Sequence, residues 1–585
     1  MTNSDIASVF EQIADLLEFQ ASNPFRVRAY RNGARKVQDY SEPLASLIAD
    51  DRPLTEIDGI GKDLAEKIKT LVETGSLPML DDLKSELPDT VLGLLRVPGL
   101  GPKKAAVLYN DLGVASLDML RAACEAGKVR ELKGFGKKTE ETLLAGISLA
   151  ERATDRIYWR DADEVVQAIL AHMEGLDAIR QLKPAGSYRR GKETVGDLDF
   201  LVDADDVDAV MDRLAEYDGV AEVIARGSTK MSVRLNSNLQ VDLRVVPSES
   251  FGAALQYFTG SKEHNVVLRG MAKDRGLRLN EWGVFRETDG EEPADSPTRG
   301  EQVAGETEED VYAALKLPWF PPELREARQE FEAASAGKLP DLIELDDLRG
   351  DLHMHTTATD GKATLREMAD AARERGLEYI AITDHSQRVS MAGGLDPDRL
   401  REQWQAIDEL RGDYDDLQIL KGIECDILEA GGMDLPDDVL AEADWVIASL
   451  HYGQNQPREQ IMDRLLEAIE HPSVTIIAHP TGRLINRRDA YDLDVDQLIA
   501  AAAKQHKMLE LNANPARLDL NDTHAAAAKR AGVPIVISSD AHSTGGLDVL
   551  RYGILQARRA GLTKKDVANT RTWKQLQKLI SRKKA

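Results

Sequence analysis

Cysteine is nearly absent from this chain of 585 residues, because Cys124 and Cys425 are the only two. Two cysteines cannot build a disulfide framework, so the composition fits a reducing compartment and we expect a cytoplasmic protein. No apolar run approaches the roughly 18 residues of a membrane-spanning helix. The charged segment from Met1 to Asp15 is expected to form a helix rather than a signal peptide. We therefore expect no membrane partner.

Basic residues are outnumbered by acidic ones. The chain has 74 Lys and Arg against 101 Asp and Glu, which gives a formal net charge of −27. This balance argues against indiscriminate binding to nucleic acid, because phosphate contacts need clustered Lys and Arg. Any contact with DNA must therefore be local. The length and the 42% hydrophobic content allow several domains with cores of their own, and we expect a monomer.

Histidines and carboxylates end a series of short apolar runs in the C-terminal half. Runs such as Tyr379–Ile382 and Val533–Ile537 are predicted to be buried parallel strands, and amphipathic segments such as Thr364–Arg375 are predicted to be helices between them. This alternation predicts a (β/α) barrel, in which polar residues at the strand ends converge at one mouth. The converging residues are His353, His355, Asp360, His385, Glu424, His451, His479, Asp540 and His542.

Imidazoles and carboxylates are ligands that suit Zn, Mn or Fe, and nine such groups exceed what one ion can use. We expect about two or three ions, which together activate a water and stabilise an in-line displacement at phosphorus. A single histidine at a strand end is more often only a hydrogen-bonded polar residue. That explanation is weak for nine groups at consistent positions.

The same residues resemble the full ligand set of PHP (polymerase and histidinol phosphatase) domains. The resemblance implies a distorted (β/α) barrel over residues 349–575. It also implies that the barrel holds about two or three Mn²⁺ or Zn²⁺ ions and hydrolyses phosphoesters.

Three Gly-x-Gly turns in the N-terminal third share one arrangement, which is an apolar residue, the turn and a basic helix start. Glycine permits a tight turn with positive φ, and N–H groups at the helix start can hold a phosphate without reading a base. The turns resemble helix-hairpin-helix motifs, although one copy alone would be an ordinary turn between helices. The residues expected to contact DNA are Gly59, Gly61, Lys62, Gly99, Gly101, Lys103, Gly134, Gly136 and Lys137.

A cluster of carboxylates is predicted in the centre of the chain. Asp197 and Asp199 lie two apart in a predicted strand and so face the same side, and Asp242 would join them from a neighbouring strand. Three carboxylates offer enough oxygen for two Mg²⁺ ions that bridge an incoming triphosphate. Gly186-Ser187 would open a helix at that triphosphate, with Arg190 as a charge clamp. Asp-x-Asp alone is common on solvated strand faces, so the interpretation depends on the neighbouring motifs.

This region resembles the nucleotidyltransferase palm of family X DNA polymerases, the group that contains polymerase β. The resemblance implies a mixed β-sheet on which the three aspartates, with Mg²⁺, catalyse nucleotidyl transfer. It continues into Tyr257–Ser261, and the stretch Asn23–Arg31 resembles the small N-terminal domain of the family. The residues implied to bind the nucleotide are Gly186, Ser187, Arg190, Gly196, Tyr257, Phe258, Gly260 and Asn265, and those implied to contact DNA are Arg244 and Arg269.

Lys67 occupies the position of the lyase nucleophile in that small domain. A lysine that forms a Schiff base must lose its proton readily. Asp63 stands one helical turn before Lys67 and would keep the ammonium charged. A surface ion pair between the two residues is at least as good an explanation as a lyase site.

Changes in composition along the chain predict the domain boundaries. The expected segments are a helical lyase-like domain (1–85), a helix-hairpin-helix domain (86–155), the palm (156–247), a thumb-like nucleotide-binding subdomain (248–335), a linker (336–348), the PHP domain (349–575) and a basic tail (576–585). The acidic stretch between Glu287 and Glu309 is expected to be a loop. The basic tail either contacts DNA or is a solvated helix end.

The two resemblances together cover nearly the whole chain. They imply a bacterial or archaeal-type family X DNA polymerase with a PHP domain. Such an enzyme would use dNTPs to fill short gaps in gapped or nicked duplex DNA during base excision repair. Its PHP domain would be a 3′→5′ exonuclease, with 3′-phosphatase and AP endonuclease as further candidate activities. The alternatives are a small-molecule phosphatase with a regulatory nucleotidyltransferase module and a DNA-end scaffold with both sites inactive.

Overall fold

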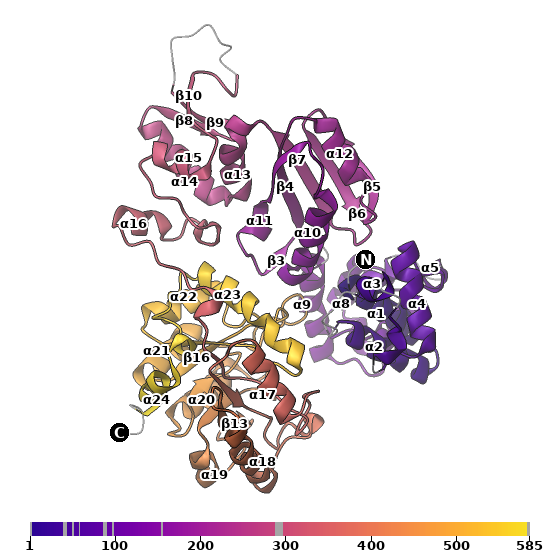
Figure 1. The fold of residues 1–585 in the computed structure, drawn as a ribbon. Helices are drawn as coiled ribbons and strands as arrows, with labels where there is room; N and C mark the ends of the chain where they lie inside the picture. The colour runs from indigo at the N-terminus through magenta and orange to yellow at the C-terminus, as the bar shows by residue number, and fades with distance from the viewer. Residues whose placement is uncertain are drawn as a thin grey trace. The chain divides into compact units, whose positions relative to one another are not determined.

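The chain folds into two compact units in the computed structural model, whose helices and strands are labelled in Figure 1. The first unit comprises Met1–Tyr188, Thr194–Phe258 and Leu279–Val311, and the second comprises Arg189–Glu193, Thr259–Arg278 and Tyr312–Ala585. The residues described are 3–38, 44–49, 52–57, 59–85, 90–95, 97, 99–153, 156–286 and 296–581. Residues 287–295 of the predicted acidic loop and residues 582–585 of the predicted tail lie outside the described residues. The loop prediction is wrong for Glu301–Ala304, which form a β-strand.

Two small helical cores form the N-terminal part of the first unit. The first core lies among α1 (Asn3–Phe19), α2 (Pro24–Gln38), α3 (Leu44–Ala49), α4 (Lys62–Thr74) and α5 (Pro78–Ser85), and the second among α6 (Val91–Leu95), α7 (Pro102–Leu112), α8 (Leu117–Glu125) and α9 (Lys137–Ala153). Buried apolar residues recur at helical spacing, as Ile13, Leu16 and Leu17 do in α1, so each helix turns one apolar face to its core.

The palm is a five-stranded mixed sheet with the strand order β2-β4-β7-β6-β5. Its strands are β2 (Ile179–Pro184), β4 (Asp197–Ala204), β5 (Val220–Arg226), β6 (Lys230–Leu235) and β7 (Gln240–Val246). β4 and β7 run parallel, and the other pairs run antiparallel. Side chains of α10 (Trp159–Met173) and α12 (Val207–Ala215) share one apolar core with the sheet. The short strands β1 (Ile157–Tyr158) and β3 (Thr194–Val195) pair separately.

The segment after the palm sheet contributes to both units. Most of α13 (Phe251–Thr259) belongs to the first unit, whereas α14 (Lys262–Asp274) belongs to the second. The three-stranded sheet of β8 (Leu277–Asn280), β9 (Gly283–Arg286) and β10 (Glu301–Ala304) belongs to the first unit except for the first two residues of β8. α15 (Glu308–Ala314) and α16 (Glu330–Ser335) follow in the chain.

Seven parallel strands, paired in sequence order, form the barrel of the second unit. They are β11 (Gly350–Asp351), β12 (Tyr379–Ile382), β13 (Gln418–Asp426), β14 (Trp445–Ser449), β15 (Ile476–Ile477), β16 (Met508–Asn512) and β17 (Ile535–Ser538). A parallel bridge between Met354 and Ala541, with the His355 N–H donating to the Ala541 carbonyl at 2.8 Å, joins the chain after β11 to the chain after β17. The strands therefore curve into a nearly closed barrel, which confirms the predicted fold class.

Both faces of the barrel strands are buried. In β12, Tyr379 and Ala381 belong to one apolar cluster, whereas Ile380 and Ile382 belong to another that includes the surrounding helices. This alternation explains why the strands are continuous apolar runs in the sequence. The helices are α17 (Leu365–Glu374), α18 (Pro397–Leu410), α19 (Asp437–Glu442), α20 (Arg458–Glu470), α21 (Val495–Lys504), α22 (Asp522–Arg530) and α23 (Leu550–Arg559).

The last helix, α24 (Trp573–Ser581), also packs on the barrel. Leu576, which composition assigns to the basic tail, is fully buried with Tyr379 and Trp445. Burial of this leucine anchors the helix, so the apolar core of the second unit extends beyond residue 575.

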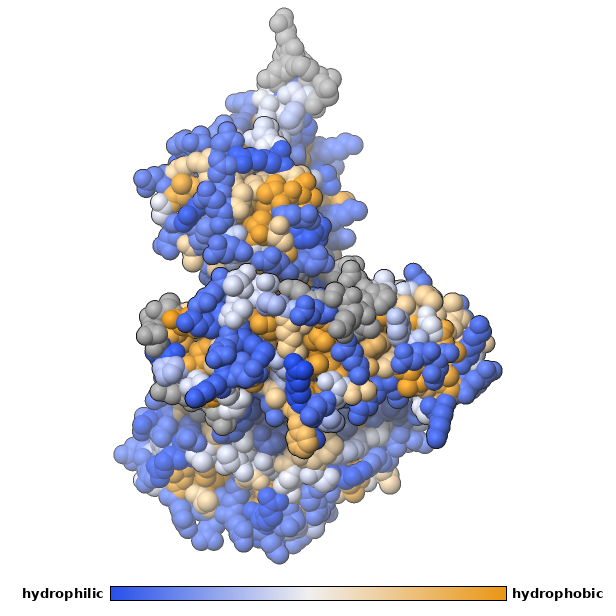
Figure 2. All heavy atoms as spheres, turned by 90° about the vertical axis from the view of Figure 1, so that its right-hand side faces the viewer, coloured by the Kyte–Doolittle hydropathy of each residue, from blue (hydrophilic) through white to orange (hydrophobic). Residues whose placement is uncertain are grey.

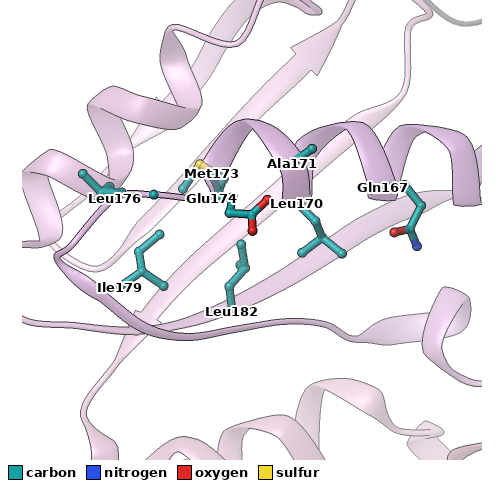
Figure 3. A pocket seen from close by; sticks show the side chains of 9 residues that line it. Gln167, Leu170, Ala171, Met173, Glu174, Leu176, Ile179 and Leu182 are labelled. Atoms are coloured by element: carbon teal, nitrogen blue, oxygen red, sulfur yellow. The ribbon is translucent and has the colours of Figure 1, made fainter.

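No helix within the described residues is long and apolar enough to cross a membrane. On the face shown in Figure 2, hydrophilic side chains predominate, as expected for a chain with 30% charged residues. A hollow of about 420 Å³ opens beside α10 in the palm, between this helix and β2 (Figure 3). Its lining includes Leu170, Met173, Ile179 and Leu182 and none of the predicted site residues.

Candidate active sites

The register of the palm sheet brings the three predicted aspartates together. Asp199 of β4 and Asp242 of β7 are direct partners in the parallel pair. Asp197 lies two residues before Asp199 on the same strand, so both side chains point to the same face. Asp197 is exposed, whereas Asp199 and Asp242 are half-buried. The three carboxylates form a site that is open to solvent on one side.

The Gly-Ser segment begins directly beside this site. The Ala185 N–H donates to the Asp199 carbonyl at 2.8 Å. Gly186 has a φ of +64°, and a Cβ at this position would lie 2.5 Å from Asp199 Oδ2, so only glycine fits there. The Ser187 hydroxyl is buried without a hydrogen-bond partner among the described residues. Such a hydroxyl is suited to a bound anion, in line with its predicted role. Gly196 directly precedes β4.

The carboxylates of the palm differ in their electrostatics. Burial and the nearby charges of Asp197 and Asp242 raise the pKa of Asp199 to about 7. Burial also acts to raise the pKa of Asp242, but hydrogen bonds from Lys230, Ser232 and Gln240 outweigh it and hold that pKa below its usual value. Asp199 thus titrates near neutrality in the metal-free protein, whereas Asp242 stays ionised.

Lys230 is a residue of the palm site that was not predicted from the sequence. Its Nζ lies 2.7 Å from Asp242 Oδ2, and Gln240 Nε2 donates to Asp242 Oδ1 at 3.0 Å. The lysine stands on β6, the antiparallel neighbour of β7, so its partner is set by sheet pairing rather than by a local motif.

Three of the other predicted residues of the first unit form an aromatic and cationic group. The rings of Tyr257 and Phe258 meet edge to face, with centroids 5.1 Å apart. The Arg244 guanidinium stacks on the Phe258 ring at 4.5 Å. Arg244, predicted to contact DNA, is therefore held on β7 close in sequence to Asp242.

Arg190, Gly260, Asn265 and Arg269 belong to the second unit. The Arg190 guanidinium donates to the Thr259 carbonyl, and a Cβ at Gly260 would lie 3.2 Å from Arg190 Nη1. Asn265 is largely buried near the start of α14, and its carbonyl accepts from Arg269 Nε at 3.3 Å. Arg190 thus lies against the segment before α14, and Asn265 and Arg269 lie in α14 itself.

His264, beside Asn265, is part of a buried cluster. Its Nδ1 lies 2.9 Å from Glu330 Oε1, its Nε2 lies 3.0 Å from the Tyr312 hydroxyl, and its ring stacks on Phe331 at 4.7 Å. Its side chain is fully buried, so this imidazole stabilises the segment and is closed to a nucleotide base.

The three Gly-x-Gly turns have the same geometry. Gly59, Gly99 and Gly134 have φ values of +85°, +83° and +90°. In each turn the residue after this glycine donates its N–H to a carbonyl three residues earlier, at 3.0, 2.9 and 3.0 Å. The second glycines, Gly61, Gly101 and Gly136, have no atom within 4 Å of an added Cβ among the described residues.

Two of the helices that follow the turns, α4 and α7, begin without a side-chain cap. Gly61 and Gly101 are the N-caps of α4 and α7, and neither helix start has a side-chain hydrogen bond at its cap. Lys62, Lys103 and Lys137 lie in the first turns of α4, α7 and α9. An anion can therefore approach the backbone N–H groups beside a lysine.

Lys67 forms the predicted ion pair with Asp63. Its Nζ contacts Asp63 Oδ1 and lies 5.9 Å from the centre of the Tyr30 ring. The lysine side chain is 19% exposed. The contact satisfies the surface-pair explanation and keeps a negative charge beside the amine.

The nine predicted metal ligands converge at one end of the barrel. His353 and His355 follow β11, His385 follows β12, His451 follows β14, His479 follows β15, and Asp540 and His542 follow β17. Glu424 lies two residues before the end of β13, and Asp360 lies in the loop after β11. The ends of parallel strands meet at the same mouth.

Glu424 is the centre of this arrangement. Its carboxylate oxygens lie 2.8 Å from His385 Nδ1, 3.0 Å from His479 Nε2, 3.5 Å from His353 Nε2 and 3.5 Å from His451 Nε2. The carboxylate is 1% exposed. His355 Nε2 lies 3.7 Å from the same carboxylate, so five imidazoles surround it. A buried carboxylate in this position needs either protons or cations to balance its charge.

The remaining ligands form two further groups. His355 Nε2 lies 3.2 Å from Asp540 Oδ1, and Asp360 lies 3.6 Å from His385 Nε2 and 3.5 Å from His542 Nε2. Three sets have ligand atoms that all lie within 4.8 Å of one another, and they are His355, Asp360, His385 and His542; His353, His355 and Asp540; and His385, Glu424 and His451.

The atoms of this mouth fit metal ions. Buried atoms of His353, His355, His385 and Glu424 have no hydrogen-bond partner among the described residues. Burial, reinforced by His542 and His385, lowers the pKa of His355 to about 3, so this imidazole is neutral and free to donate its lone pair. Mixed nitrogen and oxygen donors suit Zn²⁺, Mn²⁺ or Fe²⁺.

Two of these ligands have a strained backbone. His479 has a φ of +28° and Asp540 has a φ of +55°, although neither is glycine. Left-handed conformations of this kind cost about 1–3 kcal/mol each and cluster at functional sites. At both positions the strain turns a side chain from the end of a strand into the mouth.

Several residues that hold the ligands were missed in the sequence. Glu510 of β16 lies 2.7 Å from His353 Nδ1 and accepts the His479 N–H at 2.7 Å. Asp426 lies 3.2 Å from His451 Nδ1. Partners of this kind fix the orientation of a ligating ring. The sequence signal for Glu510 and Asp426 is a carboxylate inside an apolar strand, as at Glu424.

Family descriptions match five consecutive segments of the chain. They are a helix-hairpin-helix domain at 1–77, a SAM-like helix-hairpin-helix tandem at 91–148, the DNA polymerase beta palm at 156–252, the DNA polymerase beta thumb at 254–326 and the PHP domain at 351–514. The palm and PHP matches contain all the aspartates of the palm site and seven of the nine predicted barrel ligands, because Asp540 and His542 lie beyond residue 514.

Three relatives cover different parts of the chain. The DNA polymerase/3′-5′ exonuclease PolX of Bacillus subtilis (strain 168) is 42% identical over 590 aligned residues, which span 100% of both chains. DNA polymerase lambda of Rattus norvegicus is 24% identical over 55% of this chain and 56% of its own. A probable phosphatase of Thermoanaerobacter sp. (strain X514) is 30% identical over 38% of this chain and 89% of its own. With matching carboxylate and imidazole sites and a full-length relative of this kind, the chain belongs to the family X DNA polymerases that carry a C-terminal PHP domain.

Proposed function

We propose that the protein fills short gaps in duplex DNA and trims the 3′ ends of the same strand. The observation that carries this proposal is the presence, in one chain, of the aligned palm carboxylates and the nine-ligand barrel mouth. The full-length similarity to a DNA polymerase/3′-5′ exonuclease supports it.

In the palm, Asp197, Asp199 and Asp242 hold Mg²⁺, and Ser187 and Arg190 bind the triphosphate. When bound by these carboxylates, Mg²⁺ would supply positive charge that stabilises the charge developing on the phosphates. Lys230 keeps Asp242 ionised, and we infer that this carboxylate accepts the proton of the primer 3′-hydroxyl. Tyr257, Phe258 and Asn265 contact the nucleotide, and Arg269 contacts the DNA.

In the barrel, the nine ligands hold Mn²⁺ or Zn²⁺ ions. Such ions, when bound, supply an activated water and a positive field for the scissile phosphate. Glu510 and Asp426 keep the rings of His353 and His451 in their ligating orientation. The reaction is 3′→5′ exonucleolytic hydrolysis, with 3′-phosphatase and AP endonuclease activities as reactions of the same mouth.

Substrate recognition follows from the three Gly-x-Gly turns. They bind the phosphate backbone and leave base reading to the template, so the substrate is defined by its gap or nick. The protein acts as a monomer in the cytoplasm, where its two buried cysteines stay reduced. Lys67, paired with Asp63, is a weak candidate for a lyase nucleophile.

Gapped DNA with dNTPs and p-nitrophenyl phosphate, offered side by side, test this function. We expect incorporation into the gap and shortening of 3′ ends, with hydrolysis of the small phosphate at least about 100-fold less efficient. A small-molecule phosphatase would show the reverse preference, and an inactive scaffold would turn over neither. Incorporation that survives Asp197→Ala would refute the assignment of the palm site.

A further inference from the structure

The loop 189–193, between the Gly-Ser segment and β3, contacts helix α23 of the barrel. Arg559 of α23 donates from Nη1 to the Arg190 carbonyl at 2.7 Å, and Gln556 donates from Nε2 to the Gly191 carbonyl at 3.1 Å. Gly191 has a φ of +64°, and a Cβ there would lie 3.3 Å from Leu555 Cδ2. The loop backbone is therefore held by helix α23.

A second contact fixes the other end of the loop. Glu193 accepts two hydrogen bonds from Arg483, at 3.2 and 2.7 Å. Arg483 also donates to the Leu518 carbonyl, so it joins the loop to two segments of the barrel mouth region. Bidentate pairs of this kind add geometric restraint to the charge attraction.

Glu326 connects Arg559 to the side chain of Arg190. Its Oε1 accepts from Arg190 Nε at 3.1 Å and from Arg559 Nη1 at 3.0 Å. The Arg559 side chain is 1% exposed and also donates to Asp522 Oδ2 at 2.7 Å. A buried guanidinium needs all its donors satisfied, so Arg559 has one orientation and transmits it to both partners.

The Arg190 guanidinium is held from the opposite side as well. It donates from Nη1 to the Thr259 carbonyl and lies against the backbone of Gly260. With Glu326 on Nε and Thr259 on Nη1, its plane is fixed before any ligand arrives. Preorganisation of a charged donor lowers the entropy lost on binding a phosphate.

We propose that Arg559, a barrel residue, is a positioning residue for nucleotide incorporation. It holds the Arg190 backbone and the Glu326 carboxylate, so that the Arg190 guanidinium is preset for the triphosphate of the incoming nucleotide. This inference rests on the proposed role of Arg190. It gives a residue of the PHP domain a role in nucleotide incorporation through contacts within the second unit, in addition to the hydrolysis at the barrel mouth.

Steady-state incorporation into gapped DNA by Arg559→Gln tests the inference. We expect the KM for dNTP to rise about 10-fold while kcat changes less than about 3-fold, because binding is weakened and the chemical groups are intact. Arg558→Gln is the matched control. Arg558 is the neighbouring arginine of α23 and donates to Glu323 at 2.7 Å and to the Ile343 carbonyl at 3.1 Å, away from loop 189–193. It should leave the KM unchanged.

Arg559→Gln in an Arg190→Ala background measures the coupling between Arg559 and Arg190. We expect no further rise in KM there, since Arg559 acts through Arg190. An equal rise in both backgrounds, or the same KM for Arg559→Gln and Arg558→Gln, overturns the proposal.

If Arg559→Gln disturbs the barrel, that variant will show a lower Tm and lost exonuclease activity. Gln556→Met is then the variant that tests the proposal. It removes only the donor to Gly191, and we expect a rise of about 3-fold in the KM for dNTP with exonuclease activity retained. An unchanged KM would then overturn the proposal. Failure of the proposed function is distinguishable, because the wild-type protein would incorporate nothing.

Discussion

The palm and the barrel collect their metal ligands in different ways. The palm uses three carboxylates from two adjacent strands, and one of them, Asp197, is exposed. The barrel uses nine groups that approach from most of its strands, and the imidazoles of His353 and His355 are fully buried. The palm offers only oxygen, whereas the barrel offers mainly nitrogen.

This difference suits the two kinds of chemistry. An open oxygen site leaves room for a substrate to complete the coordination of hard ions such as Mg²⁺, which keep several ligands from phosphate and water. A buried imidazole site binds its ions before the substrate arrives and holds them tightly. We therefore expect exchangeable ions in the palm and resident ions in the barrel.

The largest effect should come from Glu424→Gln, which removes the charge at the centre of the barrel mouth. Exonuclease activity should fall roughly 10³-fold and the metal content of the purified protein should drop, because five imidazoles lose their shared carboxylate. Polymerisation should stay within about 2-fold. Mass spectrometry of bound metals and digestion of labelled primer measure both.

Glu429→Gln is the control for charge in the same β13–β14 region. Glu429 pairs with Arg388 and is partly exposed, so exonuclease activity should be unchanged. Full exonuclease activity in Glu424→Gln would exclude the barrel mouth as the exonuclease site.

The Mg²⁺ concentration that the palm requires for incorporation should depend on pH. The pKa of Asp199 is raised to about 7. Below this pH the metal-free palm therefore binds a proton, and Mg²⁺ must displace that proton. The Mg²⁺ concentration for half-maximal incorporation should rise by up to about tenfold per pH unit below about pH 7. A requirement that stays flat between about pH 5.5 and 8 would contradict the shift.

The same shift sets the sign of a stability effect. The folded pKa of Asp199 lies above its ordinary 3.8, so its contribution to stability is fully present below that value and is lost as the pH rises through about 7. Saturating Mg²⁺ should suppress this loss, because the ion replaces the proton. Thermal unfolding with and without Mg²⁺ over this range measures the difference.

The smallest effects should come from the helix-hairpin-helix lysines. Removal of one phosphate contact by Lys62→Ala, Lys103→Ala or Lys137→Ala should weaken DNA binding a few-fold and reduce the slope of log K against log salt by about 1. Lys69→Ala is a matched control, because Lys69 lies in α4 but pairs with Glu73 far from the turn. An unchanged slope in all three variants would exclude the turns as the DNA contact.

The sequence predicts the ligand sets because both are local patterns. Histidines after apolar runs must reach the mouth of a parallel barrel, and Asp197 and Asp199 must share a strand face. The pairing of Lys67 with Asp63 is local in the same sense.

Contacts between distant segments were beyond such patterns. Lys230 reaches Asp242 through strand pairing, and Glu510 reaches His353 across 157 residues. Arg559 meets Arg190 across 369 residues. Leu576 carries no signal that distinguishes a buried helix from a tail, because its flanking lysines dominate the composition. Each of these depends on how strands and helices pack, which periodicity does not encode.

One duplex with a gap and a 3′-mismatched primer end tests the central claim most directly. The wild-type protein, Asp199→Ala and His353→Ala/His355→Ala are each offered this duplex with dNTPs and Mg²⁺ and Mn²⁺. We predict that the aspartate variant degrades the primer without extending it and that the double histidine variant extends it without degrading it. Loss of both activities in either variant would contradict two separate sites acting on one DNA end.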